Sequence, residues 1–472
     1  MTNSTSDSLG DVHAGAPAAR ARASSGVATR IRYVVLATIF LVTTLNYADR
    51  ATLSVTGPAM RAEFGFGAVQ MGYMFSAFSW AYVLAQVPGG WLLDRFGPRR
   101  VYACSIFAWS LFTLLQAGTG WGSAIVSGLG AVTTLFVLRF AVGLAESPAF
   151  PANAKLVASW FPTAERGTAS AIFNSAQYFA AMAFTPLMAA ITHWFGWRMV
   201  YVSMGATGMV FALLWMRFMR SPSRHPSVNR AELQHIADGG GLIDMGEAAP
   251  QSPAQSRTMK EGRTLFYLKR LLANRMLLGV YIGQFSINVL TYFFLTWFPV
   301  YLVQQRHMSI LKAGFMASLP ALCGFVGGVL GGLLSDSLLR AGWSLTAARK
   351  LPIISGMLLS VSLILCNYVD SEWLVVGLMA LAFFGKGVGS LGWAVVADTA
   401  PREVVGLAGS IFNMFGNTAG IVTPIVIGYI VDTTGSFNLA LVFVGLNALV
   451  TVVAYTVVVG KIRRIEFQDA PA

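Results

Sequence analysis

Long apolar segments recur along almost the whole chain and are separated by short polar stretches. Each is roughly 17 to 25 residues long, the length that an α-helix needs to cross a bilayer. Twelve such segments lie at about 33–55, 69–93, 101–118, 126–150, 167–190, 197–217, 276–300, 313–338, 351–369, 373–397, 405–430 and 437–460. The pattern predicts an all-α membrane protein with twelve transmembrane helices.

Composition supports this prediction. The 472 residues are 55% hydrophobic and only 11% charged, which is typical of a polytopic membrane protein and not of a soluble one. The three cysteines, Cys104, Cys323 and Cys366, lie in apolar runs, so neither a disulfide framework nor a thiolate metal site is indicated. No cofactor is expected.

The net charge of +13 raises the possibility of a nucleic-acid partner, but its placement indicates membrane topology. With a cytoplasmic amino terminus, the inside segments hold most of the Lys and Arg, ten of them between residues 217 and 275. The outside loops hold Arg61, Arg198, Arg306 and Lys312. The positive-inside rule therefore predicts two cytoplasmic termini and no nucleic-acid partner.

Polar segments divide the chain. Residues 1–32 are rich in Ser, Ala and Gly and lack a signal-peptide core, so a disordered cytoplasmic tail is expected. The polar stretch 218–275 is a predicted cytoplasmic linker between a half at 33–217 and a half at 276–460, and residues 461–472 form a second tail.

The halves carry an internal repeat. An offset of 239 aligns identical residues, and an offset of 242 sets Gly90–Arg95 against Gly332–Ser337. Six crossings give both halves the same orientation, so two parallel six-helix halves with a substrate site between them are predicted. The identities at the first offset are Pro162/Pro401, Gly167/Gly406, Ala169/Ala408, Ile172/Ile411, Phe173/Phe412 and Asn174/Asn413.

Charged residues interrupt two of the spans. The first span contains Asp49 and Arg50, and the fourth contains Arg139 and Glu146 two turns apart on one helical face. Each ion costs at least about 2.5 kcal/mol at membrane depth, so it must face a water-filled or protein-lined interior. Either pair of charges alone could be a buried ion pair that only fixes helix packing. The two pairs together predict one cavity between the two charged helices.

The segment Gly90-Trp-Leu-Leu-Asp-Arg-Phe-Gly-Pro-Arg-Arg100 resembles the loop motif between the second and third spans of the major facilitator superfamily. The resemblance implies a gating role for Gly90, Asp94, Arg95, Gly97, Arg99 and Arg100. Asp94 is expected to face the positive end of the helix that starts near Val405. A generic charged turn explains the arginines but not the Gly-Asp-Gly spacing.

More narrowly, the chain resembles the anion:cation symporter family. Residues 46–50 (Asn-Tyr-Ala-Asp-Arg) match its first-span motif, and Arg139 with Glu146 match its fourth-span pair. The stretches 71–95, 173–180, 225–245 and 385–401 are similar to the family's glucarate/galactarate carriers. The resemblance implies proton-coupled uptake of a sugar acid across a bacterial inner membrane. The Gly-Pro-Gly-Gly signature of drug antiporters is absent from 170–191.

In the first half, Arg50 is the first choice for a substrate carboxylate, since a guanidinium binds one bidentately. Asp49 and Glu146 are the predicted proton carriers, because their arginine neighbours can couple proton occupancy to substrate binding. The other predicted substrate contacts of this half are Tyr47, Tyr82, Arg139 and Gln177, of which Tyr82 and Gln177 come from the resemblance. Packing hydrogen bonds are the alternative role for Tyr82 and Gln177.

In the second half, Lys386, Ser390 and Trp393 share one face of the tenth span. Asn413 and Asn417 lie one turn apart in the eleventh. Lys386 is predicted to bind an anion, because snorkelling from mid-span reaches the interface poorly. Trp393 and the two amides are expected to contact the carbon skeleton and hydroxyls of a polyol.

Other functions stay open at this point. Galactonate, a hexuronate or an aromatic acid are alternative substrates, and a non-transporting receptor is an alternative class. An enzyme is not expected: the five histidines lie in tails, loops or span ends, and the spans hold no Cys/His/carboxylate cluster. The expected partners are an organic anion, protons and the lipid bilayer, with the chain acting as a monomer.

Overall fold

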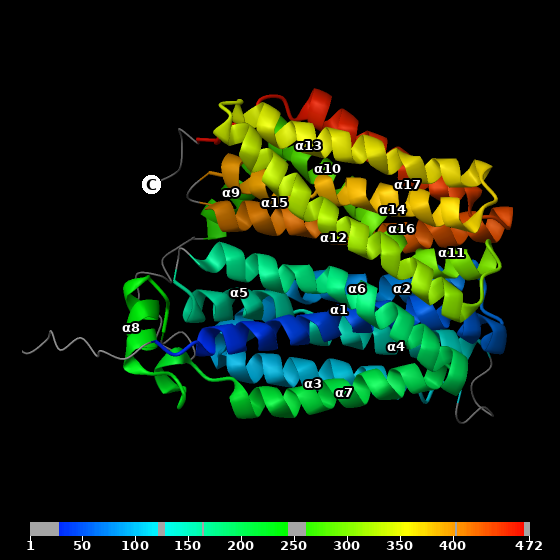
Figure 1. The fold of residues 1–472 in the computed structure, drawn as a ribbon, viewed down its shortest axis with the longest axis horizontal. Helices are drawn as coiled ribbons and strands as arrows, with labels where there is room; N and C mark the ends of the chain where they lie inside the picture. Colours follow the sequence, from blue (N-terminus) through cyan, green and yellow to red (C-terminus); the bar gives the residue numbers. More distant parts are fainter. Residues whose placement is uncertain (1–27, 121–127, 163–164, 244–260, 402–403, 467–472) are drawn as a thin grey trace, which may run out of the picture.

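The computed structural model describes residues 28–120, 128–162, 165–243, 261–401 and 404–466. These ranges are helical and contain no strand, and the helices gather into two bundles that lie side by side (Figure 1). The all-α prediction is confirmed. Of the predicted tails at 1–32 and 461–472, residues 1–27 and 467–472 lie outside the described residues, and α1 already begins at Ile31.

Six membrane-crossing segments build the first half. They are α1 (Ile31–Phe64), α2 (Ala68–Phe96), α3 (Pro98–Gln116), α4 (Gly128–Glu146) with its continuation α5 (Ala149–Trp160), α6 (Arg166–Phe195) and α7 (Trp197–Phe218). Ser147 and Pro148 separate α4 from α5, because proline cannot donate a backbone hydrogen bond and bends the helix there.

Six more segments build the second half, several of them in two pieces. They are α10 (Arg275–Tyr292) with the π-helical η3 (Phe293–Trp297) and α11 (Phe298–Gln304), α12 (Ile310–Arg340), α13 (Leu345–Ser360) with η4 (Val361–Tyr368), α14 (Glu372–Val388) with α15 (Gly392–Thr399), α16 (Val405–Thr434), and α17 (Asn438–Val453) with η6 (Ala454–Val458). The break between α14 and α15 falls at Gly389-Ser390-Leu391.

Nine helical segments in the described ranges are both long and apolar enough to cross a membrane: 31–64, 130–160, 197–218, 275–304, 310–340, 345–368, 372–399, 407–434 and 438–458. The other three, α2, α3 and α6, have 29, 19 and 30 residues and also reach spanning length. Together they give the twelve predicted crossings. The first helix runs nine residues beyond the predicted end at 55. It ends at Phe64, before Gly65, whose φ of 70° caps the helix.

The sequence repeat reappears as matching helices. Adding 239 to the bounds of α6 gives the bounds of α16, residue for residue, and both helices have 30 residues. Adding 242 to the first residue of α2, Ala68, gives the first residue of α12, Ile310. These four helices also form the seam, where α2 packs on α16 and α6 packs on α12. Since α2 corresponds to α12 and α6 to α16, the same pair of corresponding helices packs at both contacts across the seam.

The seam is tightest at the end opposite the linker. A Cβ added to Gly72 would lie 2.5 Å from the carbonyl oxygen of Pro424, so only glycine allows this approach of α2 and α16. Arg61 also donates to Gln304 across the halves over 2.7 Å. The contacts Tyr73–Tyr429, Phe75–Trp297 and Tyr178–Phe325 between the halves also lie at this end or at mid-depth. The halves are thus closed against each other away from the linker.

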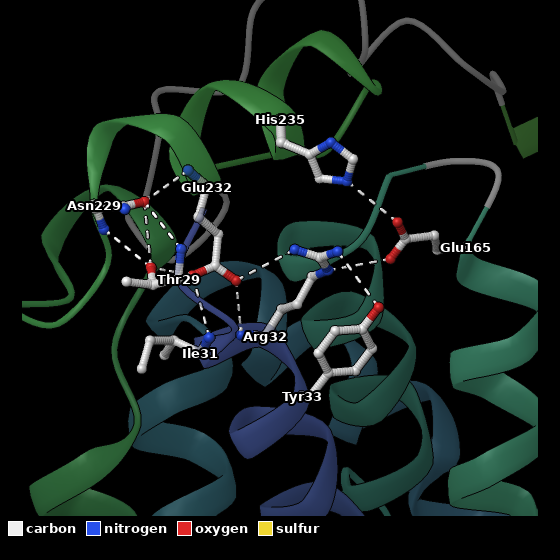
Figure 2. Close-up of polar contacts among 8 residues, drawn as sticks. All are labelled: Thr29, Ile31, Arg32, Tyr33, Glu165, Asn229, Glu232 and His235. Atoms are coloured by element: carbon white, nitrogen blue, oxygen red, sulfur yellow. Dashed lines mark hydrogen bonds and ion pairs between the residues drawn. The ribbon is translucent and has the colours of Figure 1, made fainter. Parts of the chain in front are cut away.

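The linker docks on the first half through α8 (Arg230–Asp238), while α9 (Glu261–Ala273) precedes α10. The carboxylate of Glu232 is fully buried and accepts hydrogen bonds from the backbone N–H groups of Ile31 and Arg32, each over 3.1 Å (Figure 2). It thereby caps the first turn of α1, where helical N–H groups lack partners. Arg32 also pairs with Glu165 over 3.1 Å. The part of the linker that contains α8 is therefore folded onto the first half, whereas α9 packs on α10 of the second half.

Candidate functional site

A buried ion pair joins the first and fourth spans. The Nε of Arg50 lies 3.0 Å from the Oε2 of Glu146, and the two side chains are 8% and 0% exposed. The Nη2 of Arg50 and the Oε1 of Glu146 have no hydrogen-bond partner among the described residues. Each member of the pair thus keeps one polar atom available to another ligand.

Aromatic rings enclose the Arg50 guanidinium. Its central carbon lies 4.8 Å from the ring of Tyr47, 4.5 Å from that of Phe78 and 5.1 Å from that of Tyr82. Ring faces attract a cation without neutralising it. Two of the predicted substrate contacts, Tyr47 and Tyr82, are therefore brought to Arg50. Phe78 has no charge or polar group and was missed from the sequence.

Asp49 does not pair with its neighbour Arg50. Its carboxylate accepts a hydrogen bond from the Thr113 hydroxyl of α3 over 2.7 Å, and the side chain is buried. Arg139 of α4 instead donates to the backbone carbonyls of Asp49 and Arg50, over 3.2 and 3.0 Å. The four charges predicted from the sequence do meet, but Arg139 holds the backbone of α1.

Close helix packing fixes this arrangement. A Cβ on Gly143 would lie 2.4 Å from the carbonyl oxygen of Phe78, so α4 touches α2 one turn before Glu146. α4 then ends at Glu146, ahead of Ser147 and Pro148. Glycine before the carboxylate and proline after it set the depth and direction of the Glu146 side chain.

In the second half, Lys386 is a buried cation, 5% exposed. Its Nζ lies 5.1 Å from the ring centre of Phe383 and 5.8 Å from that of Tyr178, which belongs to the first half. Within the described ranges it forms no ion pair. Lys386 thus lies at the seam, with aromatic rings and no carboxylate around it.

The other predicted contacts of the tenth span lie where α14 ends and α15 begins. The Ser390 hydroxyl donates to the carbonyl of Lys386 over 2.8 Å. Trp393 is 56% exposed and packs against Phe412 with ring centres 4.9 Å apart. More than half of the Trp393 side chain therefore stays uncovered by this chain, as contact with a ligand requires.

The amides form a short hydrogen-bonded row. Asn417 donates to the Asn413 side chain over 3.1 Å and accepts from the Tyr292 hydroxyl, also over 3.1 Å. Gln177 belongs to α6 of the first half and bonds within its own helix, where its amide donates to the Asn174 carbonyl over 3.1 Å. Asn413, Asn417 and Tyr292 come together in the second half, and all three are half-buried.

The loop motif forms the turn between α2 and α3. Gly97 has φ 78° and serves as the last cap of α2 and the first of α3, a conformation that side-chain-bearing residues rarely adopt. Arg99 donates to the Met216 carbonyl of α7 over 2.7 Å, whereas Arg95 and Arg100 are exposed. A side chain on Gly90 would meet nothing within 4 Å. The predicted contact of Asp94 involves side chains outside those described.

The second half holds a polar cluster at the turn between α12 and α13, which corresponds to the α2–α3 turn of the first half. The cluster was not predicted. Arg349 pairs with Asp398 over 2.8 Å and with Asp336 over 3.6 Å, and donates to Ser335 over 2.8 Å. Ser335 and Asp336 belong to the repeat at offset 242, so the repeat pointed to this site. Arg349 and Asp398 are about fifty residues apart, and only the fold joins them.

Two further polar residues, Tyr102 and Asn153, were missed because they are uncharged, and Asn46 was matched to the first-span motif without a role. All three are at most 1% exposed, and each has a side-chain atom without a partner among the described residues. Glu232 was also missed, although Asn229 followed three residues later by Glu is the pattern of a helix start. Within the described residues, no group of three or more His, Cys, Asp or Glu could hold a metal ion.

Similar proteins are named as transporters. The probable galactarate/D-glucarate transporter GudP of Bacillus subtilis (strain 168) is 59% identical over 441 residues, 93% of this chain and 94% of that protein. The probable galactarate/D-glucarate transporter GarP of Escherichia coli (strain K12) is 56% identical, covering 93% and 96%. The D-galactonate transporter of Escherichia coli O6:H1 is 40% identical, covering 92% and 97%.

Solved structures share the fold. A D-xylose-proton symporter superposes with a TM-score of 0.66 at 16% identity, covering 90% of this chain and 98% of that one. A bacterial homologue of the lysosomal transporter Spinster, in an inward-facing, unoccupied conformation, gives 0.67 at 16% identity, covering 92% and 95%. The family model described as Major Facilitator Superfamily matches residues 39–348. With twelve helices in two matching halves, the chain belongs to the Major Facilitator Superfamily.

Proposed function

We propose that this protein is a proton-coupled symporter that takes up a hexarate dianion, galactarate or D-glucarate. The observation that carries the proposal is the pair of buried cations contributed by opposite halves. Arg50 keeps a free Nη2, and Lys386 forms no ion pair with any described residue. A dianion supplies one carboxylate to each cation, whereas a monocarboxylate leaves one of them uncompensated.

The polar groups of the second half suit a polyhydroxy acid. Tyr292, Asn413 and Asn417 offer amide and hydroxyl groups, and the exposed indole of Trp393 offers an apolar face for the carbon skeleton. The names of the similar Bacillus and Escherichia proteins support the same substrate class.

Charge balance supports proton coupling. Moving two negative charges inward against about 100 mV costs about 4.6 kcal/mol, so two protons bring the net charge moved to zero. We assign the two protons to Asp49 and Glu146, which are buried carboxylates of the same half. Arg50 then alternates between Glu146 and a substrate carboxylate. Both chain ends and the linker lie on the cytoplasmic side of a bacterial inner membrane in this proposal, and the unit is a monomer.

The test is uptake of radiolabelled galactarate into proteoliposomes under an imposed pH gradient. We expect accumulation that collapses when an ionophore removes the gradient. Lys386→Met is expected to reduce galactarate uptake at least tenfold while any galactonate uptake falls less than twofold. Equal loss of both substrates, or uptake of galactonate alone, would contradict the dianion assignment.

Galactonate is the second candidate substrate, because a 40% identical protein is named a D-galactonate transporter. Under that reading Lys386 has no substrate carboxylate to bind, and its neighbours Phe383 and Tyr178 alone hold it at the seam. The ratio of galactarate to galactonate uptake in the wild type separates the two candidates directly.

A further inference from the structure

Unpartnered polar atoms cluster inside the first half, between α1, α3 and α5. Asn46 is 1% exposed, and neither atom of its amide has a hydrogen-bond partner among the described residues. The Oδ1 of Asn153 and the hydroxyl of Tyr102 are likewise buried and without partners. Buried polar atoms are nearly always hydrogen-bonded, and leaving one unpaired costs about 1 to 3 kcal/mol.

These side chains adjoin the proton-carrying site. Asn46 lies on α1 one turn before Asp49 and Arg50, and one turn after Thr43, on the same side of the helix. Asn153 donates to the Thr43 hydroxyl over 3.0 Å. The Tyr102 hydroxyl lies within hydrogen-bonding reach of the Thr43 and Asn153 side chains and within electrostatic range of Glu146. The row therefore runs from Glu146 toward the end of the molecule where α1 and α3 begin.

The chemistry of the row identifies what fills it. The unpaired donors are Asn46 Nδ2, Arg50 Nη2 and the Tyr102 hydroxyl. The unpaired acceptors are Asn46 Oδ1, Asn153 Oδ1 and Glu146 Oε1. A metal cation satisfies acceptors only, and the two arginines beside it oppose its charge. Water donates and accepts, and bridges both kinds of atom.

Glu146 needs such a route in this conformation. Its side chain is 0% exposed, and Arg50 with its three surrounding rings covers its Oε2. The remaining charged and titratable groups that face it, Asp49, Arg139, Tyr82 and Tyr102, are buried as well. In this conformation Glu146 has no direct contact with solvent, so a proton reaches it by way of neighbouring groups.

We propose that Asn46, Tyr102 and Asn153 hold a row of buried water molecules that carries protons between Glu146 and the linker end of the first half. The inference rests on the proposed function and adds a proton route separate from the substrate contacts. Each water accepts one proton and passes another on, so the side chains orient the row without being consumed. Tyr102 and Asn153 are thus positioning residues for the coupled proton.

The test follows protonation of Glu146 by time-resolved infrared spectroscopy after a pH jump, in the purified full-length protein. The carboxyl band of Glu146 is identified by its loss in Glu146→Gln. We expect Asn153→Leu and Tyr102→Phe each to slow the appearance of this band at least tenfold. Galactarate counterflow, which needs no net proton movement, should change less than twofold.

Tyr455→Phe is the matched control. Tyr455 is a fully buried tyrosine of the second half, and its hydroxyl also lacks a partner among the described residues. The same loss of an oxygen there should leave the protonation rate unchanged. Asn153→Ser, which keeps a hydrogen-bonding side chain, should restore part of the rate lost in Asn153→Leu.

Four results decide between the inference and its failure. Slow protonation with intact counterflow supports the inference. Unchanged protonation in both variants overturns it, as does a high-resolution map with no water beside Asn46. If the wild type shows no proton-driven galactarate uptake, the proposed function fails instead, and the infrared rates still decide whether the water row exists.

Discussion

At the scale of single residues, the site depends on which polar atoms are left without partners. Arg50 is held by one ion pair, from its Nε to Glu146, and by aromatic rings. Its Nη2 has no hydrogen-bond partner among the described residues and is available to a second carboxylate. Removing one partner of a buried ion pair is far more costly than removing the pair, about 3 to 5 kcal/mol. A substrate carboxylate that replaces Glu146 at Arg50 avoids this cost, and so does a proton that neutralises Glu146.

Arg50→Lys is therefore expected to weaken galactarate binding at least tenfold, about 1.4 kcal/mol, although the charge is kept. Lysine presents a single ammonium group and cannot hold a carboxylate with two parallel hydrogen bonds. Isothermal titration calorimetry on the detergent-purified protein measures the change. Arg198→Lys, at the partly exposed pair with Glu63, is the control and should bind as the wild type does. Equal affinity for all three would restrict Arg50 to packing.

Glu146→Gln is expected to abolish accumulation against a gradient while galactarate counterflow continues. The amide keeps the size of the carboxyl group but cannot carry a proton, so substrate exchange is separated from proton movement. Uptake and counterflow in proteoliposomes are compared at equal protein content, after size-exclusion chromatography confirms a folded sample. Glu63→Gln, far from the pair, should accumulate substrate normally. A Glu146→Gln variant that still concentrates galactarate would exclude Glu146 as a proton carrier.

At the scale of elements, the short helix α8 ties the linker to the start of α1. Asn229 caps α8 by accepting from the backbone of Glu232 over 2.9 Å, and the Glu232 carboxylate caps α1 in turn (Figure 2). The free N–H groups at the start of α1 are thus bonded by a residue of α8 that is about two hundred positions away in the sequence. The arrangement fixes the first part of the linker to the first half, whereas α9 at its other end packs on α10 of the second half.

Glu232→Ala is expected to lower the free energy of unfolding by about 2 kcal/mol, because hydrogen bonds to a buried charged group are lost. Thermal unfolding in detergent should show a lower midpoint, and limited proteolysis should cut near Arg230 faster. Glu372→Ala removes a carboxylate of the same kind from a pair with Lys312 in which both side chains are about 40% exposed, and such exposed pairs contribute at most about 1 kcal/mol. Identical midpoints for both variants would mean that the docked linker adds no stability.

At the scale of the whole molecule, transport requires the seam to close at one end and open at the other. The described structure is closed at the end opposite the linker, where Gly72, Gly428 and Gly314 let helices of the two halves touch. Backbone contact at glycine leaves no side chain to repack. This end of the seam therefore responds sharply to any added volume.

Gly72→Val is expected to shift the equilibrium away from closure at this end by about 5- to 150-fold, since overpacking costs about 1 to 3 kcal/mol. Spin labels at the exposed positions Phe195 and Leu439, in a background without native cysteines, report the separation of the halves by pulsed electron resonance. Gly377→Val is the control, because a Cβ there meets nothing within 4 Å. Unchanged distances in Gly72→Val would show that the seam accommodates the valine.

The sequence by itself determined the membrane spans and the two matching halves. These features depend on local properties: the length of an apolar run sets a span, and a repeat offset such as 239 carries helix bounds from one half to the other. The resemblance of the motifs also indicated the superfamily. The roles of the predicted site residues remain predictions, although the fold brings Arg50, Asp49, Arg139 and Glu146 together.

Only the tertiary structure decided which of these groups meet. Arg50 pairs with Glu146 of another helix and not with the adjacent Asp49, and Arg139 holds a backbone. Such choices depend on the rotation and depth of helices that are distant in sequence, which no local pattern specifies. The unpaired amide of Asn46 and the capping carboxylate of Glu232 arise in the same way, because burial is decided by what packs around a side chain.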